Sequence, residues 1–131
     1  MRAARHLVPG LALVLGVALG LGACAQATEV VLVVDTDLGV PGELTRVEID
    51  VLNDRTASIR TGVDFTTPGA TALPLVLGIT ARRADAMVVV QVRGYLDGGE
   101  IITRDARTAI VPGSSRMLRV VLSRRCLGHE C

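Results

Sequence analysis

The stretch MVVVQVRGYLDGGEIITRDARTAI, residues 87–110, decides the fold of this chain. In its first ten residues Val88, Val90 and Val92 point to one face and Gln91 and Arg93 to the other, which is typical of a half-buried β-strand. The Asp97-Gly98-Gly99 sequence that follows is a hairpin signal. We therefore expect residues 101–110 to return antiparallel to residues 87–96.

Turn residues divide the rest of the chain into further strand-like segments. Together with 87–96 they make seven predicted strands, the others being 30–34, 46–52, 57–65, 73–79, 101–110 and 117–122. The β-branched run 30–34 predicts a buried strand. Pro74 cannot donate a backbone hydrogen bond, so 73–79 is expected to be an edge strand or to begin near the proline. Seven short strands predict an all-β, antiparallel sandwich of immunoglobulin-like or prealbumin-like type over residues 30–123.

The first 23 residues have the layout of a secretory signal. Arg2 and Arg5 precede an uncharged stretch, 7–21, which is shorter than the roughly 20 residues that a membrane-spanning helix needs. The sequence Leu21-Gly22-Ala23-Cys24 then resembles the bacterial lipobox. This resemblance implies cleavage before Cys24, acylation of its thiol and of the new amino terminus, and a short lipidated tether at 24–29.

Two other outcomes for the amino terminus stay open. Small residues at 23, 25 and 27 also fit ordinary signal cleavage, which would give a soluble exported product, and the apolar stretch could remain as an uncleaved anchor. The lipobox reading predicts a lipid-anchored protein of the cell envelope whose partner, through its amino-terminal lipid, is a membrane. Ala25 is not an acidic retention signal, so the outer membrane is favoured.

The whole layout is similar to a loose group of bacterial lipoproteins from GC-rich Gram-negative organisms. The similarity is carried by residues 21–24, by VVLVVDTDL at 30–38, by ARTAIVPG at 106–113 and by RCLG at 125–128. It implies the same envelope location and a sandwich fold, and it brings no established activity. In similar proteins a short cysteine-rich tail often follows the sandwich, whereas this sequence stops at Cys131.

Composition argues against several classes of function. Every one of the 14 basic residues is Arg, and loss of Arg2 and Arg5 leaves 12 of them against 13 acidic residues, so no basic patch for nucleic acid is expected. Phe65 and Tyr95 are the only aromatic residues, too few for stacked bases. The absence of Lys excludes a P-loop, and His129 is the only histidine after the signal. We predict a protein that is not an enzyme and has no cofactor.

Two groups of residues are candidates for metal chemistry. Asp35 and Asp37 follow a predicted strand and could hold calcium, with Asp97 or Glu100 as a further ligand, although a solvated strand end with a turn cap is the reading we favour. In the tail, 124–131, we expect a disulfide between Cys126 and Cys131. Free thiols, or zinc or copper bound with His129, are the alternatives.

The predicted function is that of a membrane-anchored accessory, adhesion or protein-interaction module in the cell envelope. Its working surface is expected at the loops of one sandwich end or at the edge strand 73–79, which could receive a strand from a protein partner. The alternative is a module that binds calcium or a small ligand at Asp35 and Asp37.

Overall fold

The computed structural model describes residues 27–53, 56–80, 86–129 and 131. In this part of the chain the regular structure is seven strands and one short 3₁₀ turn: β1 (Glu29–Thr36), β2 (Arg46–Asn53), β3 (Thr56–Asp64), β4 (Leu75–Ile79), β5 (Met87–Leu96), β6 (Gly99–Ala109), β7 (Ser115–Leu122) and η1 (Arg124–Cys126). The all-β fold expected from the sequence is confirmed.

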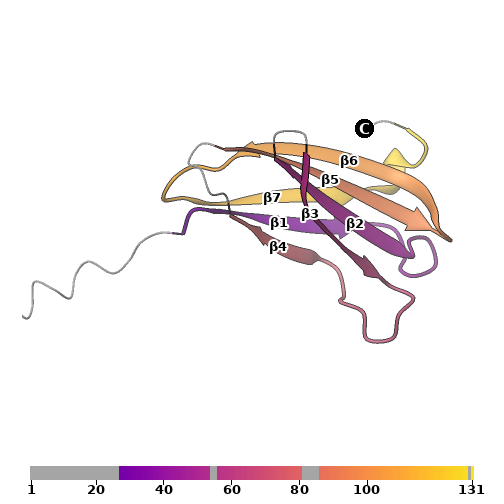
Figure 1. The fold of residues 1–131 in the computed structure, drawn as a ribbon. Helices are drawn as coiled ribbons and strands as arrows, with labels where there is room; N and C mark the ends of the chain where they lie inside the picture. The colour runs from indigo at the N-terminus through magenta and orange to yellow at the C-terminus, as the bar shows by residue number, and fades with distance from the viewer. Residues whose placement is uncertain (1–26, 54–55, 81–85, 130) are drawn as a thin grey trace, which may run out of the picture.

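The strands form two sheets that lie one over the other (Figure 1). One sheet has three strands in the order β4-β1-β7, and the other has four strands in the order β3-β2-β5-β6. Buried side chains from both sheets make one core between the two layers. We call these sheet A, with three strands, and sheet B, with four strands.

The hairpin between β5 and β6 forms as predicted. Leu96 pairs with Gly99, so the connection is the two residues Asp97 and Gly98. Both have positive φ, 51° and 82°, which is the backbone that a tight two-residue hairpin turn requires. Glycine adopts this conformation freely and Asp tolerates it better than most residues.

One pairing corrects the expectation of a wholly antiparallel sandwich. Strands β1 and β7 run parallel, from Glu29 opposite Ser115 to Thr36 opposite Leu122, while the other four described ladders are antiparallel. Short hairpins impose antiparallel pairing only on strands that follow one another closely. The first and last strands are joined through the whole domain, so their relative direction is set by packing.

The core is aliphatic and tightly packed. Its completely buried side chains come from both sheets and from the segments beside them: Val30, Leu32, Val34, Leu44, Val47, Val90, Val92, Ile110 and Leu122. Gly94 lies within this core, where an added Cβ would be 2.7 Å from Ile102 Cγ2 and 2.8 Å from Leu44 Cδ1. A side chain at position 94 would therefore displace its neighbours.

Burial along β1 differs from the expectation of a buried run, and one inward-facing residue of β3 is exposed. In β1 only Val30, Leu32 and Val34 are fully buried, and the valines between them are half-buried on the outer face of sheet A. In β3, Ile59 points inward by register with Val51, yet 52% of it is exposed. Sheet B is one strand wider than sheet A, so its edge strand β3 is incompletely covered.

Both predictions for the segment around Pro74 are confirmed, namely that the strand begins near the proline and that it lies at a sheet edge. Strand β4 begins at Leu75, directly after the proline, and it lies at an edge of sheet A. It pairs on one side with β1, from Val34 opposite Leu75 to Val30 opposite Ile79.

Candidate functional site

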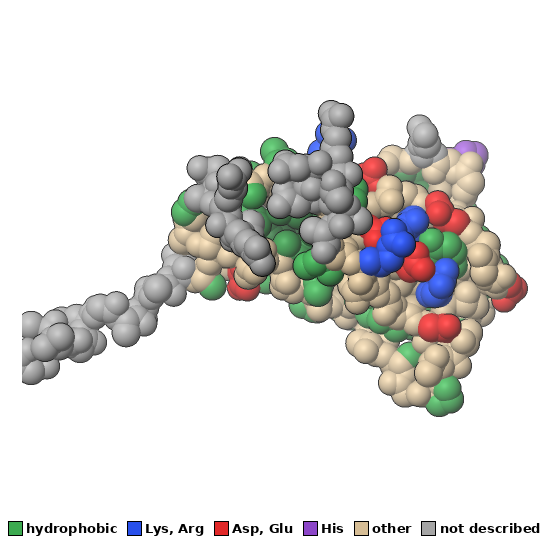
Figure 2. Space-filling model, viewed as in Figure 1, with side chains coloured by type: hydrophobic (Ala, Val, Ile, Leu, Met, Phe, Trp, Pro, Cys, Tyr) green, Lys and Arg blue, Asp and Glu red, His purple; other side chains and the backbone are tan. Residues whose placement is uncertain are grey.

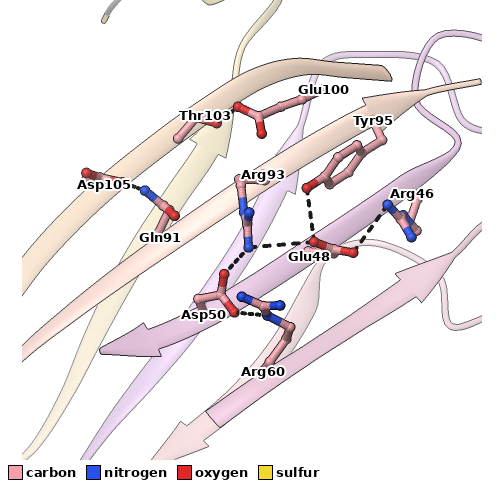
Figure 3. Close-up of polar contacts among 10 residues, drawn as sticks. All are labelled: Arg46, Glu48, Asp50, Arg60, Gln91, Arg93, Tyr95, Glu100, Thr103 and Asp105. Atoms are coloured by element: carbon pink, nitrogen blue, oxygen red, sulfur yellow. Dashed lines mark hydrogen bonds and ion pairs between the residues drawn. The ribbon is translucent and has the colours of Figure 1, made fainter. Parts of the chain in front are cut away.

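Charged side chains gather in one patch of the surface seen in Figure 2. The strands of sheet B build this patch, because alternate residues point outward: Glu48 and Asp50 from β2, Arg93 and Tyr95 from β5, and Arg60 from β3. Register brings them together, since Glu48 is opposite Arg93 and Asp50 is opposite Arg60. We call these five residues and Arg46 the sheet B polar cluster (Figure 3).

Asp50 is the buried centre of the cluster. Only 2% of it is exposed, although it lies on the outer face of a sheet. Arg60 Nε donates to Asp50 Oδ1 at 2.6 Å, and Arg93 Nη2 donates to Asp50 Oδ2. Burial alone would raise the pKa of Asp50, but the hydrogen bond from Arg60 and the charge of Arg93 outweigh it and hold the pKa below its ordinary value.

Glu48 joins the other half of the cluster. Its Oε2 accepts a hydrogen bond from Tyr95 Oη at 3.0 Å and lies 3.6 Å from Arg93 Nη2, and its Oε1 lies 3.2 Å from Arg46 Nη2. The Arg46 guanidinium also lies 4.4 Å from the centre of the Tyr95 ring, within cation–π range. Burial and the hydrogen bond to Glu48 raise the pKa of Tyr95, which keeps its phenol a donor.

The chemistry of the cluster is that of a structural network. Two guanidinium groups keep Asp50 ionised, so it is poorly suited to donate a proton. Tyr95 is kept protonated, so it is poorly suited to act as a nucleophile. Cross-strand pairs of opposite charge stabilise a sheet. Alternation along 46–52 and 87–96 is enough to place Asp50 and Arg93 on polar faces, but it does not predict the cluster, because the register that pairs three strands is a tertiary property.

Asp35 and Asp37, the predicted calcium candidates, are bound to different parts of the chain. Asp35 Oδ2 accepts from Arg119 Nη2 on β7 at 2.8 Å. Asp37 accepts from Arg124 N at 2.6 Å and from Ser123 Oγ at 3.0 Å, where the tail begins. The hydrogen bond from Arg119 lowers the pKa of Asp35, and that from the Arg124 backbone lowers the pKa of Asp37.

The other proposed calcium ligands do not complete a site with these two. Asp97 lies in the β5–β6 turn, and Glu100 Oε1 accepts from Thr103 Oγ1 at 2.5 Å. Within residues 27–53, 56–80, 86–129 and 131, no group of three or more His, Cys, Asp or Glu side chains is arranged to hold a metal ion. The two aspartates therefore act as attachment points for β7 and for the tail.

Calcium is expected to leave the stability of the protein unchanged. The carboxylates of Asp35 and Asp37 already accept hydrogen bonds from Arg119, Arg124 and Ser123, which an ion would have to displace. Titration calorimetry with calcium chloride should give only dilution heat, and the melting temperature should not rise. A saturable heat that disappears in an Asp35→Ala, Asp37→Ala double variant would contradict this assignment.

The tail carries the predicted disulfide. Cys126 and Cys131 are bonded, with their Cα atoms 5.6 Å apart, and Cys126 is buried. Arg104 Nη1 donates to Cys126 Sγ at 3.4 Å and to the Cys131 carbonyl at 3.3 Å, which ties the tail to β6. The thiols needed for the alternative metal site with His129 are thereby consumed.

Removal of this disulfide is expected to lower the free energy of unfolding by about 2 kcal/mol, the value for closing a loop of this length. The change is a Cys126→Ser, Cys131→Ser double variant, compared with the parent protein by urea denaturation. The parent in reductant is the matched control and should show the same loss. Equal stability of the oxidised parent and the double variant would contradict the prediction.

A groove of about 390 Å³ lies between two loops at the end of the sandwich that holds the β5–β6 turn. The β1–β2 loop contributes Val40 and Pro41, and residues 65–72 of the β3–β4 loop form the rest of the wall. Backbone bonds join this end together, with Thr45 N donating to the Tyr95 carbonyl and Phe65 N donating to the Thr45 carbonyl, both at 2.8 Å.

The predicted signal and Cys24 lie outside the described residues. Along the stretches that the structure describes, no helix has the length and apolar character needed to cross a membrane. Comparisons of the chain with protein-family models, with curated proteins and with solved structures give no match.

Proposed function

We propose that this chain is a lipoprotein of the bacterial cell envelope and that its sandwich is an accessory, adhesion or protein-interaction module without catalytic activity. The observation that carries the proposal is the position of Cys24 relative to the domain. Thr28 Oγ1 accepts a hydrogen bond from Gly113 N at 2.9 Å, so the domain begins four residues after Cys24. Four residues span at most about 14 Å. A lipid on Cys24 would thus keep this end of the sandwich beside the membrane, at the outer membrane in the version we favour.

The loops at the other end of the sandwich are the proposed surface for a protein partner. Strand β1 has eight residues, so these loops begin about 25 Å along the strand from the anchored end. The β1–β2 loop, residues 65–72 and the disulfide tail meet there. Loops carried by a rigid scaffold are the usual place for recognition. The edge of β4 is the second surface open to a partner strand.

We propose further that the sandwich is of the prealbumin-like rather than the immunoglobulin-like type. In a constant immunoglobulin domain the first strand shares a sheet with the second, fourth and fifth strands. Here β1 lies between β4 and β7 and does not share a sheet with β2. The strand order β4-β1-β7 with β3-β2-β5-β6, and the parallel β1–β7 pair, support this assignment.

The lipoprotein proposal is tested at Cys24 on the protein expressed in a Gram-negative host. Mass spectrometry should give a product that starts at Cys24 with acyl chains attached, and phase separation should place it in the detergent phase. Cys24→Ser should abolish the modification. The Cys126→Ser, Cys131→Ser variant is the matched control and should stay acylated. An unmodified amino terminus, with the protein in the aqueous phase, would overturn the proposal.

A further inference from the structure

The outer face of sheet A carries a group of exposed apolar side chains. Register places Val31 of β1 beside Met117 of β7, and Val33 beside Val76 of β4. Met117 and Val76 are 73% and 65% exposed, and Val121 continues the face along β7. Three of the six large hydrophobic side chains that are exposed in the described part of the chain lie on this face. None of these three side chains is needed to fill the core, so their grouping on one face indicates a surface that binds a partner.

The face also carries the charged residues Glu29, Asp35 and Arg119, and Arg119 lies opposite Val33, between Met117 and Val121 on β7. Asp35 is paired with Arg119 at 2.8 Å, and Glu29 Oε1 accepts from Ser115 Oγ at 3.1 Å. At Gly78, which is opposite Val31, an added Cβ would have only the Glu29 carboxylate nearby, at 3.9 Å. The charged groups of this face therefore bond to one another or to a neighbouring hydroxyl, and the exposed apolar side chains lie beside and between them.

The area of the face distinguishes between a second copy of the protein and a membrane as the partner. Three strands about 4.8 Å apart and five or six residues long give a face of about 300 Å². A stable protein–protein interface buries about 800 Å² on each partner. A second copy packed on this face alone would be held too weakly in solution. A surface this small can bind stably only to a partner that a separate attachment already holds near the protein.

The bilayer is such a partner, because the proposed tether leads directly into β1, the central strand of this face (Figure 1). We propose that the outer face of sheet A lies on the lipid bilayer, with Val76, Met117 and Val121 in the interfacial region. This inference rests on the proposed acylation of Cys24. A link of at most about 14 Å gives the face a high effective concentration at the membrane, so weak apolar contacts suffice. The sheet B polar cluster then points away from the membrane.

The chain provides a matched pair of probe sites for the test. Met87 is also exposed, at 57%, but it lies on the outer face of sheet B, since its neighbour Val88 points into the core. Met117→Cys and Met87→Cys are made singly in the full acylated protein, labelled with a fluorophore and bound to vesicles of phosphatidylethanolamine and phosphatidylglycerol. Quenching by aqueous iodide and by lipids brominated in their acyl chains is then measured. Vesicle flotation is recorded first.

The expected result is that vesicle binding lowers iodide quenching at position 117 by about threefold and introduces quenching by the brominated lipids, with neither change at position 87. Equal iodide quenching at both positions in protein that floats would overturn the inference and leave the lipoprotein proposal intact. Protection at 117 that appears only at high protein density, without lipid quenching, would overturn it in favour of a second copy. Failure of the acylated protein to float would overturn both.

Discussion

Leu32→Ala is expected to lower the free energy of unfolding by about 4 kcal/mol. Leu32 is completely buried in β1, the central strand of sheet A, and it belongs to the core between the two sheets. Truncation of a buried leucine costs the lost transfer free energy and leaves a cavity, about 2 to 5 kcal/mol in all. A domain of this size has about 5 to 15 kcal/mol in total, so this one substitution should remove about a quarter or more of the stability.

The neighbouring residue provides the control for this substitution. Val33→Ala changes the same strand, but its side chain is half-buried on the outer face of sheet A. It should cost less than about 1 kcal/mol, because little of its surface is removed from water. Urea denaturation at constant m-value measures both changes. Similar losses for the two variants would contradict the packing described here.

Asp50→Ala is expected to cost about 3 kcal/mol, because it removes the carboxylate that two guanidinium groups share. Arg93 should account for more of the loss than Arg60, since the side chain of Arg93 is 21% exposed and that of Arg60 is 65% exposed. Arg60→Ala alone should therefore cost much less than Asp50→Ala, because ion pairs with an exposed partner contribute little. Chemical denaturation of the variants measures these differences.

Asp105→Ala is the matched control for Asp50→Ala. Asp105 is also an outward-facing aspartate of sheet B, but its contact is an exposed hydrogen bond from Gln91 Nε2 at 3.1 Å. Its removal should change stability by no more than about 0.5 kcal/mol. If both aspartates cost the same, Asp50 is not the centre of the polar cluster.

The lowered pKa of Asp50 also predicts the direction of the pH dependence. A carboxylate whose pKa is lower in the folded state contributes stability that is complete above its unfolded pKa, about 4, and is lost as the pH falls through the folded pKa. The free energy of unfolding should therefore fall as the pH drops below about 4. Asp50→Asn, measured over the same range, should show a smaller fall. An unchanged slope would assign the acid sensitivity to other carboxylates.

The fold could be predicted as far as local pattern determines it. The bounds of β5 and the position of the β5–β6 turn follow from alternation and turn chemistry at residues 87–99. The order of strands within the sheets, and the parallel direction of β1 and β7, could not be predicted, because they depend on which distant segments bury their faces together. For the same reason the run 30–34 was expected to be buried throughout, while its alternate valines face outward.

Some of the candidate sites could likewise be predicted from the sequence, and others could not. The Cys126–Cys131 disulfide was predicted from the even number of cysteines left in a chain expected to be exported, and it is present. Asp35 and Asp37 attracted attention because they are close in sequence, yet they serve different contacts, because β1 ends at Thr36, between them. Asp50, Arg60 and Arg93 were separated by many residues and carried no motif. The sequence shows only that these residues have opposite charges and occupy alternating positions of strands. That they contact one another follows from the register of β3, β2 and β5.

The parallel pairing of β1 with β7 bears on how the domain responds to mechanical tension. The chain enters β1 at one end of this ladder and leaves β7 at the other. A pull between the two termini is therefore directed along the strands and strains all eight paired positions simultaneously, in shear, instead of peeling them apart one after another. Resistance to stretching in this direction should consequently exceed that of a hairpin opened from its ends.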